Sequence, residues 1–439
     1  MSTECSACVR HIDGGGSLTT LNDDGGAPSR FAHRFERPAR PLTGPRDVLR
    51  DTTTETATNG LIGIVFSATG PVAVILAVGA QGGLSPAQLA SWIFGVFLLN
   101  GLLTVLASSL YRQPLAFFWT IPGAVVVGGS LDHLPWPQVV GAFVATALLI
   151  LVLGLTGLVR TVMAALPMPV VMAMVAGVFL RFGLDLVHSL GLDPGIAVPM
   201  VAVFLLLSAF PALGRRIPPI LGALVVGAVA VAVSGRFTPD TESTTWFASP
   251  LLQAPQFSWQ AILELVVPLA VTVLVVQNGQ GVAVLRQAGH EPPTNVSTVL
   301  CGLWSLPAAL FGAVSTCLTG PTNALLVASG ERGRQYTAAI VCGLLAMLVG
   351  LFAPAFVRLM LATPESFIAV LGGLAMLRAL QTAFVTAFRS RCTLGALVAF
   401  LVTVSGVSPL NLSAAFWGLV AGVAISLLLE RADYAAERS

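Results

Sequence analysis

Long apolar runs separated by short polar breaks fill the chain from Leu61 to Leu429. A helix needs roughly 20 mostly apolar residues to cross a bilayer core of about 30 Å. Turn residues divide the region into fourteen candidate spans. Their predicted starts are Leu61, Ala87, Pro114, Pro137, Thr161, Ile196 and Ile217, then Ile262, Val296, Ala313, Tyr336, Phe356, Thr393 and Asn411. The pattern predicts an all-α integral membrane protein with a lipid bilayer as its surroundings.

Two of these spans, the third and the tenth, are too short and too interrupted to be single helices. In each, a few residues lead into a proline, at Pro122 and Pro321, and then into a short apolar run. Proline fits the first turn of a helix, where a missing N–H costs nothing. We therefore predict a short extended stretch followed by a half-length helix in both places. Paired interrupted segments in two halves of a membrane chain indicate the binding site of a transporter.

The placement of arginine supports the number of spans and gives their orientation. If the N-terminus is cytoplasmic, nearly all arginines between spans fall in cytoplasmic turns, as the positive-inside rule requires. Arg181 and Arg358 are mild exceptions near outer ends, and Arg378 has no clear place. We predict a multi-pass protein of the bacterial inner membrane with both termini cytoplasmic. Seven spans followed by seven place the second half upside down relative to the first, which is an inverted repeat.

The chain ends differ from the apolar region between them. Residues 1–60 are rich in Ser, Thr, Gly, Asp and Arg and are predicted to form a disordered cytoplasmic tail. Residues 61–430 form the membrane domain, with a first repeat at 61–235 and a second at 260–430. Residues 431–439 are expected to be a cytoplasmic C-terminal tail.

Composition argues against an enzyme. Hydrophobic residues make up 55% of the chain and charged residues only 10%, with a net charge of +2. All five histidines fall in the tail or in turns, so no catalytic triad or metal site assembles, and a chain without lysine has no phosphate-binding loop with its lysine. Cys5 and Cys8 form only a lone Cys-x-x-Cys pair, a weak metal signal. No cofactor, metal or nucleic-acid partner is predicted.

Several ordered motifs resemble one family of carriers. These are Gln277-Asn278-Gly279-Gln280-Gly281 running to Arg286, Arg334-Gln335-Tyr336-Thr337, the run 400–407, and Ala415-Phe416-Trp417-Gly418. They resemble the benzoate/proton symporters of the BenE type over about Leu61 to Leu429. The resemblance implies the seven-plus-seven fold shared with nucleobase and sulfate permeases, with spans 1–4 and 8–11 in a core domain and spans 5–7 and 12–14 in a gate domain. It implies import of benzoate or a related aromatic acid with a proton, bound between the domains near half-helices 3 and 10.

The chain departs from relatives around the tenth span, which reads Val314-Ser315-Thr316-Cys317-Leu318-Thr319-Gly320. The glutamates that related nucleobase carriers use in spans 8 and 10 are not evident, and Glu264, at the start of span 8, is interpreted as an interfacial residue. The proton is carried either by the protein or by the substrate's own carboxylate, or coupling is absent. A nucleobase or other organic-anion permease, and a channel-like anion mover of the same fold, stay open as alternatives. A homodimer through the gate domains is expected by analogy of fold.

A carboxylate leaving water needs replacement donors, and two half-helix N-termini facing one cavity supply unpaired N–H groups and positive dipole ends. Neutral donors suit a monoanion that must also leave. Aromatic rings such as Phe66, Phe118 and Trp119 are candidates to stack on the substrate ring. The alternative is that these polar groups only join helices. The predicted substrate-binding residues are Phe66, Ser67, Thr120, Gly123, Gln277, Asn278, Gln280, Thr319, Thr322 and Asn323.

Overall fold

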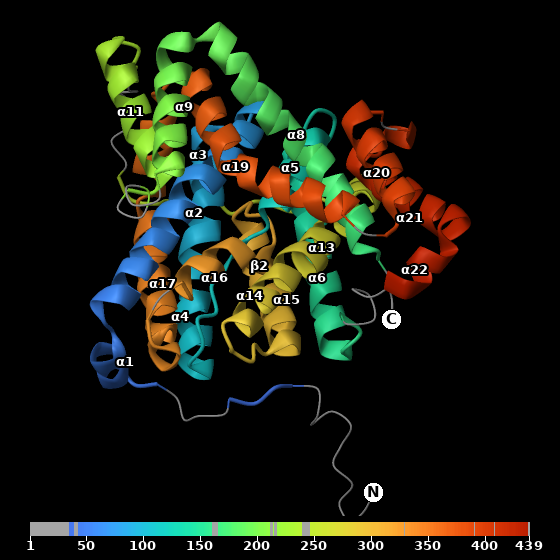
Figure 1. The fold of residues 1–439 in the computed structure, drawn as a ribbon, viewed down its shortest axis with the longest axis horizontal. Coiled ribbons are helices and arrows are strands. Elements are labelled where there is room, and N and C mark those ends of the chain that lie inside the picture. The colour runs from blue at the N-terminus through green and yellow to red at the C-terminus, as the bar shows by residue number, and fades with distance from the viewer. Residues whose placement is uncertain are drawn as a thin grey trace, which may run out of the picture.

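The computed structural model describes residues 35–38, 43–159, 166–210, 214, 217–238, 246–328, 330–389, 391–407 and 409–437. Seven helical segments within them are long and apolar enough to cross a membrane. Five shorter apolar helices, the helix α15 and the half-helix α16 complete fourteen spans in the described part of the chain (Figure 1). The predicted number of spans is thus matched by the helices that are described.

The first half contains α2 (Thr54–Gln81), then α3 (Pro86–Phe94), a π-helical turn η1 (Gly95–Leu99) and α4 (Asn100–Tyr111) as one span. The third span is the strand β1 (Phe117–Trp119) followed by α5 (Ile121–Ser130). The remaining spans are α6 (Trp136–Thr156), α8 (Met168–Leu192), α9 (Pro194–Ala209) and α11 (Pro219–Val233).

The second half begins with one long span made of α12 (Trp259–Ala261), η2 (Ile262–Val266), α13 (Val267–Val271), η3 (Thr272–Asn278) and α14 (Gly279–Gln287). It continues with α15 (Thr294–Leu310), the strand β2 (Thr316–Leu318) with α16 (Gly320–Leu326), and the short η4 (Arg332–Arg334) leading into α17 (Tyr336–Leu351). The last elements are α18 (Ala353–Leu361), α19 (Glu365–Phe388), α20 (Thr393–Ser405), η5 (Pro409–Asn411), α21 (Ala414–Leu429) and α22 (Arg431–Glu437).

Two predicted boundaries change clearly. The prediction of a twelfth span beginning at Phe356 is wrong, because that residue lies in the separate helix α18 and the span begins at Glu365. Thr363 and Pro364 separate the two helices, since the residue before proline disfavours helical geometry. The first span begins at Thr54, seven residues before the predicted Leu61. The predicted start of the fifth span, Thr161, lies outside the described residues, in which the helix α8 of that span begins at Met168.

Part of the segment predicted to be disordered is helical. A short helix α1 (Pro45–Asp51) precedes α2, and the Thr53 side chain caps α2 by accepting a hydrogen bond from the Thr56 N–H. Arg112 forms an ion pair with Asp47 at 3.1 Å, and the Tyr336 hydroxyl donates to Asp51 at 2.8 Å. These contacts hold α1 against the ends of α4 and α17, so the prediction of disorder is wrong for this part. Residues 1–34 lie outside the described residues.

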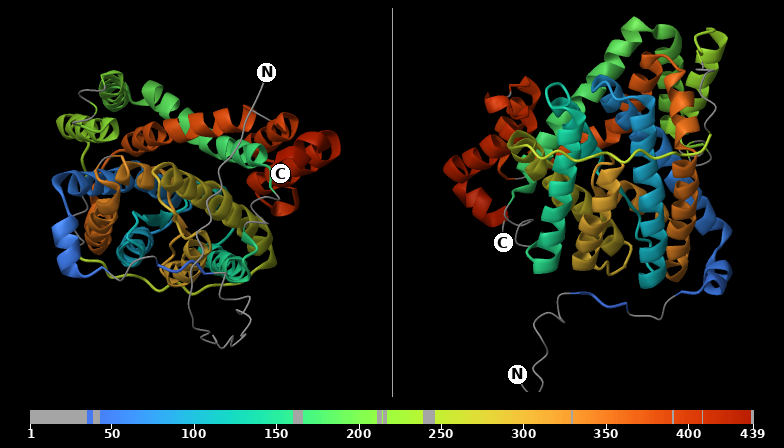
Figure 2. Two further views of the ribbon diagram at one scale, coloured as in Figure 1. Left: turned by 60° about the horizontal axis from the view of Figure 1, so that its bottom comes forward. Right: turned by 180° about the vertical axis from the view of Figure 1, so that it is seen from behind.

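The helices form two layers. One contains α2 to α6 and α12 to α17, and the other contains α8, α9, α11 and α19 to α21 (Figure 2, left). We call them the core domain and the gate domain, as predicted from the resemblance. Residues 246–258 connect the repeats as an extended segment across the core, with backbone hydrogen bonds from Ala248 to Leu351 and from Gln253 to Leu310 (Figure 2, right).

Candidate functional site

The two interrupted spans meet in the middle of the core domain. Strands β1 and β2 pair antiparallel, with Phe118 opposite Cys317. Two further backbone hydrogen bonds extend the pairing, from the Thr120 N–H to the Ser315 carbonyl and from the Thr319 N–H to the Ala116 carbonyl, both at 3.1 Å. Each strand leads directly into its half-helix, so the starts of α5 and α16 are brought to the same depth from opposite directions.

Two predicted site residues hold this crossing together. The Asn323 amide, fully buried, accepts from the Ala116 N–H at 3.0 Å and donates to the Thr319 carbonyl at 2.7 Å. Asn278, on η3, accepts a hydrogen bond from the Leu318 N–H at 2.7 Å. Both amides therefore satisfy strand backbone that has no water available, which favours a structural role for them.

The N-termini of the two half-helices differ. Thr120 caps α5, because its hydroxyl accepts from the Gly123 N–H at 3.1 Å, so this predicted donor is already occupied. Thr319 forms no side-chain cap on α16, and within the described chain no hydrogen bond reaches the N–H groups of Gly320 and Thr322. The α16 end is thus the one with unpaired backbone donors.

A small cavity lies between these ends and α2. It is lined by two hydroxyl residues of the tenth span, Thr319 and Thr322, by Ser67, and by the aromatic and apolar residues Phe66, Pro71, Phe118, Trp119 and Ile121. Ser67 and Thr322 share a hydrogen bond of 3.2 Å. The cavity volume is only about 10 Å³, roughly the space of one water molecule. An aromatic acid therefore needs this space to widen.

Pro71 leaves a backbone carbonyl, that of Ser67, without its helical partner next to this cavity. Proline inside α2 donates no backbone hydrogen bond, so the carbonyl of Ser67 loses its helical partner. On the other side, Phe118 and Trp119 pack edge-to-face on Phe97, with ring centroids 6.0 and 5.1 Å away. The Phe97 ring therefore supports the two rings that line the cavity.

The remaining predicted amides lie on the span that contains η3 and α14. Gln277 is buried, and its Oε1 atom has no hydrogen-bond partner within the described residues; the same holds for the buried Ser315 hydroxyl. Gln280 packs against Gly320 at the start of α16, where a Cβ would lie 2.6 Å from the Gln280 Cβ. An unpaired buried amide is costly, so Gln277 is the amide most available to a ligand.

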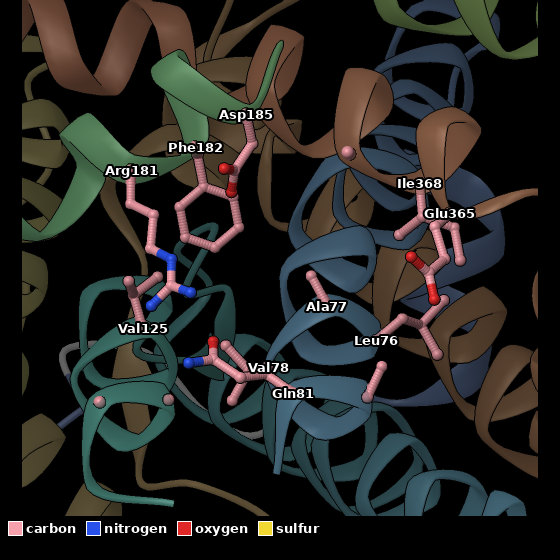
Figure 3. Close-up of a pocket in the computed structure, with 14 residues that line it drawn as sticks. Leu76, Ala77, Val78, Gln81, Val125, Arg181, Phe182, Asp185, Glu365 and Ile368 are labelled. Atoms are coloured by element: carbon pink, nitrogen blue, oxygen red, sulfur yellow. The ribbon is translucent and has the colours of Figure 1, made fainter. Parts of the chain in front are cut away.

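Two larger clefts open between the core and gate domains, on the side where α2, α5 and α8 carry Gln81, Ser130 and Asp185. We call this the outer side, following the orientation predicted from arginine. One cleft, of about 350 Å³, lies between α2, α5, α8 and α19; the other, of about 450 Å³, lies between α5, α8 and α20–α21. Arg181 lines both, and no ion pair or hydrogen bond engages its side chain within the described residues. Its guanidinium extends from α8 towards Val125 and Gln81 (Figure 3).

Glu264 does not occupy the interfacial position predicted for it. Its side chain is fully buried, it accepts a hydrogen bond from the Ser130 hydroxyl, and it lies 2.9 Å from His133 Nε2. Its neighbours Leu263 and Val267 are the exposed residues on this part of the span. The Glu264 side chain therefore faces the interior of the core domain and not the surroundings of the protein, so the interfacial interpretation is wrong.

A family model described as the benzoate membrane transport protein matches residues 50–428. The chain belongs to the benzoate membrane transport protein family. Two relatives of this family member are the inner membrane protein YdcO of Escherichia coli (strain K12) and the benzoate membrane transport protein of Acinetobacter baylyi. The first is 31% identical over 386 residues, covering 85% of this chain and 97% of the relative; the second is 27% identical over 377 residues, covering 84% and 94%.

The fold of this family member is similar to the transmembrane domain of a cyanobacterial bicarbonate transporter, BicA. The TM-score is 0.54 with 17% sequence identity, and the match covers 88% of this chain and 99% of that one. The predicted inverted repeat of seven plus seven spans is thereby confirmed. The chain is a multi-pass membrane protein and a secondary transporter, and its family is one of transporters rather than enzymes.

The structure brings Phe66, Ser67, Thr319 and Thr322 together around one cavity and puts Thr120, Gly123, Gln277, Asn278, Gln280 and Asn323 in the surrounding framework. Sequence reasoning missed Arg181 and Glu264 as groups of interest. The signal for Arg181 was present, since it broke the orientation pattern of the other arginines.

Proposed function

We propose that the protein imports a small aromatic carboxylate, with benzoate as the representative substrate, together with a proton. Transport occurs by alternating access of the core domain against the gate domain, across the bacterial inner membrane with both termini cytoplasmic. The observation that carries the proposal is the cavity between the crossed half-helices, where hydroxyl and aromatic side chains face the same space. The membership of the chain in its family supports the class of substrate.

The two parts of the cavity suit the two parts of the substrate. Thr319 and Thr322, with the unpaired N–H groups at the start of α16, offer neutral hydrogen-bond donors to the carboxylate. A second contribution is the positive end of the α16 dipole, worth about 0.3–1 kcal/mol and up to about 2 kcal/mol when partly buried. Phe66, Phe118 and Trp119 offer ring faces and edges to the aromatic group.

Binding by neutral hydrogen-bond donors allows the anion to dissociate again. No arginine lies among the residues that line the cavity, so the carboxylate is not fixed by a buried ion pair, which is strongly destabilising to break. Gln277, on the span that contacts β2, and Ser315, just before that strand, hold unpaired polar atoms that can take a partner when the cavity widens. We propose that widening between α2 and the half-helices accompanies substrate entry from the outer clefts.

Import is tested by uptake of radiolabelled benzoate into proteoliposomes that are preloaded with unlabelled benzoate, with protein-free liposomes as the background. We expect saturable exchange that other benzoates compete for and that uracil and sulfate do not. Competition by uracil alone would replace the proposal with a nucleobase permease. Flux that does not saturate would indicate a channel-like anion mover.

The proposed homodimer through the gate domains has a separate test. Light scattering of the purified protein in detergent would give its mass, and a single-chain mass would contradict the dimer.

A further inference from the structure

Glu264 is the one acidic side chain among the described residues that is fully buried. It lies on η2, in the outer part of the eighth span, and both of its oxygen atoms have partners: the Ser130 hydroxyl at Oε1 and His133 Nε2 at Oε2. A buried carboxylate is expensive in a membrane protein, and such residues mark ion or proton pathways. Glu264 is not among the proposed benzoate-binding residues, so binding of the carboxylate does not explain its burial.

The surroundings of Glu264 contain few other charges. The helices packed against η2, namely α5, α6, α12 and α13, carry no acidic or basic residue. Beyond these helices, the nearest elements with charged residues are the turn after α5, which carries Asp132 and His133, and α8, which packs against α5 and carries Arg181 and Asp185. Asp132 is itself hydrogen-bonded to the Gln81 amide at 3.1 Å. Within the part of the chain that the structure describes, His133 is thus the only titratable group in direct contact with Glu264.

His133 also connects the buried acid to water. Its side chain is 24% exposed and lines the 450 Å³ outer cleft, whereas the Glu264 side chain is 0% exposed. The His133 imidazole, which can accept a proton at one ring nitrogen and donate one from the other, therefore lies between the outer cleft and Glu264.

The pair is linked mechanically to the proposed substrate cavity. Ser130 is the last residue of α5, and Ile121, the first residue of that ten-residue helix, lines the cavity. At 1.5 Å per residue the two ends are about 15 Å apart. The proton-binding group and the substrate-binding region are therefore carried by one half-helix in the core domain.

We propose that Glu264 and His133 together form the binding site of the co-transported proton; this rests on the proposed function. One proton from the outer cleft is taken up by the pair, converting the Glu264 carboxylate to a carboxylic acid whose O–H is shared with His133 or Ser130. The proton neutralises the single negative charge of the bound carboxylate. The loaded core domain then carries no added net charge past the gate domain, which lowers the cost of moving through a medium of low dielectric constant.

The test separates exchange from coupled accumulation in proteoliposomes. Exchange of internal for external benzoate requires no net proton movement, whereas accumulation driven by an acidic exterior does. For Glu264→Gln we expect wild-type exchange with loss of gradient-driven accumulation to the level of protein-free vesicles. For His133→Gln we expect the outer pH that supports accumulation to shift, because the connection to the cleft is altered.

The matched control is Glu291→Gln, an exposed acid beyond the opposite end of the same span, which should keep both activities. Wild-type accumulation in both Glu264→Gln and His133→Gln would overturn the proton site. Loss of exchange along with accumulation in both variants would overturn it too, because the residues would then be needed for alternation itself. No exchange in the wild-type protein would instead overturn the proposed function.

Discussion

At the scale of single residues, amides that look alike in the sequence have different surroundings. The side chains of Asn278 and Asn323 form hydrogen bonds with the backbone of the two interrupted spans. Gln277, next to Asn278, keeps an unpaired buried oxygen. Adjacent residues on a helical turn point in different directions, so one can support the strand while the other faces a different environment.

The neighbours are distinguished by substitution with alanine. Asn278→Ala leaves the Leu318 N–H without a partner, so we expect the free energy of unfolding to fall by about 1–3 kcal/mol. Gln277→Ala removes an unsatisfied amide, so we expect unchanged or higher thermal stability with weaker benzoate binding. Thermal unfolding in detergent, with and without benzoate, measures both. Equal destabilisation by the two substitutions would contradict this division of roles.

The sequence was sufficient for the features that have a local or periodic cause. Pro122 and Pro321 mark the two half-helices, and the long apolar runs mark the spans, whereas the order of inner and outer turns stays a prediction from the arginines. Contacts between segments that are far apart in the sequence could not be predicted. Nothing near Asn323 in the sequence indicates that its amide pairs with Ala116, 207 residues away. Likewise, the partners of the buried Glu264, Ser130 and His133, are 134 and 131 residues away.

At the scale of elements, the span containing α14 crosses the tenth span without room for a side chain. A Cβ on Gly281 would lie 2.5 Å from the carbonyl oxygen of Leu318, in strand β2. The closeness of this crossing is what allows Asn278 to reach the same strand.

Gly281→Ala is therefore expected to destabilise the protein by about 1–3 kcal/mol, the usual cost of overpacking, and to reduce benzoate exchange. The control is Gly191→Ala in α8, where a Cβ meets no atom within 4 Å. Thermal unfolding and exchange assays compare the two variants. If both behaved as the wild type, the close crossing would not be needed for transport.

Three elements of the gate domain are joined at Asp193, in the turn between α8 and α9. Its carboxylate accepts hydrogen bonds from Ser366 Oγ, at the start of α19, at 2.5 Å and from Arg236 Nη1, after α11, at 2.6 Å. The hydrogen bond from Ser366 and then that from Arg236, with its charge, lower the pKa of Asp193 from its ordinary value of 3.8. The turn thereby links α8, α11 and α19.

Because the pKa of Asp193 is lower in the folded state, its contribution to stability is complete above pH 3.8 and is lost as the pH falls through the folded pKa. At neutral pH, Asp193→Asn is expected to lower the free energy of unfolding by about 1–2 kcal/mol. Glu331→Gln, which breaks an exposed ion pair with Arg334, is expected to change it by less than about 1 kcal/mol. The free energy of unfolding of both variants is measured from acid to neutral pH. Equal loss of stability by the two variants at neutral pH would contradict the assignment.

At the scale of the whole molecule, the clefts lie on one side of the contact between the two domains, and Arg181 stands at their junction. No ion pair of Arg181 is found among the described residues. A cation in a narrow, low-dielectric opening raises the local concentration of anions and speeds their encounter. The substrate cavity itself has no such charge. Arg181 therefore attracts the anion at the clefts, whereas the uncharged cavity binds it further along the path.

We expect Arg181→Gln to raise the KM for benzoate uptake from the outer side by about 3- to 10-fold with little change in kcat, and to weaken the dependence of KM on salt. Arg378→Gln is the matched control, because Arg378 is an exposed arginine of α19 that bonds to Gln381 at 3.3 Å. Initial rates at low and high ionic strength measure the effect. An unchanged KM at low salt would remove Arg181 from the entry path.

The most direct test of the account is a titration of purified protein with benzoate, followed by thermal unfolding, for the wild type, Thr319→Val and Thr146→Val. A ligand that binds only the folded protein raises its apparent stability. Thr319 lines the central cavity, whereas Thr146 is buried in α6 and bonds only to the Ala142 carbonyl. If benzoate binds between the half-helices, Thr319→Val loses one hydrogen bond and needs about 2- to 10-fold more benzoate for the same shift, while Thr146→Val titrates as the wild type. Identical titration curves for the wild type and Thr319→Val, or no stabilisation by benzoate in any of the three, would contradict the account.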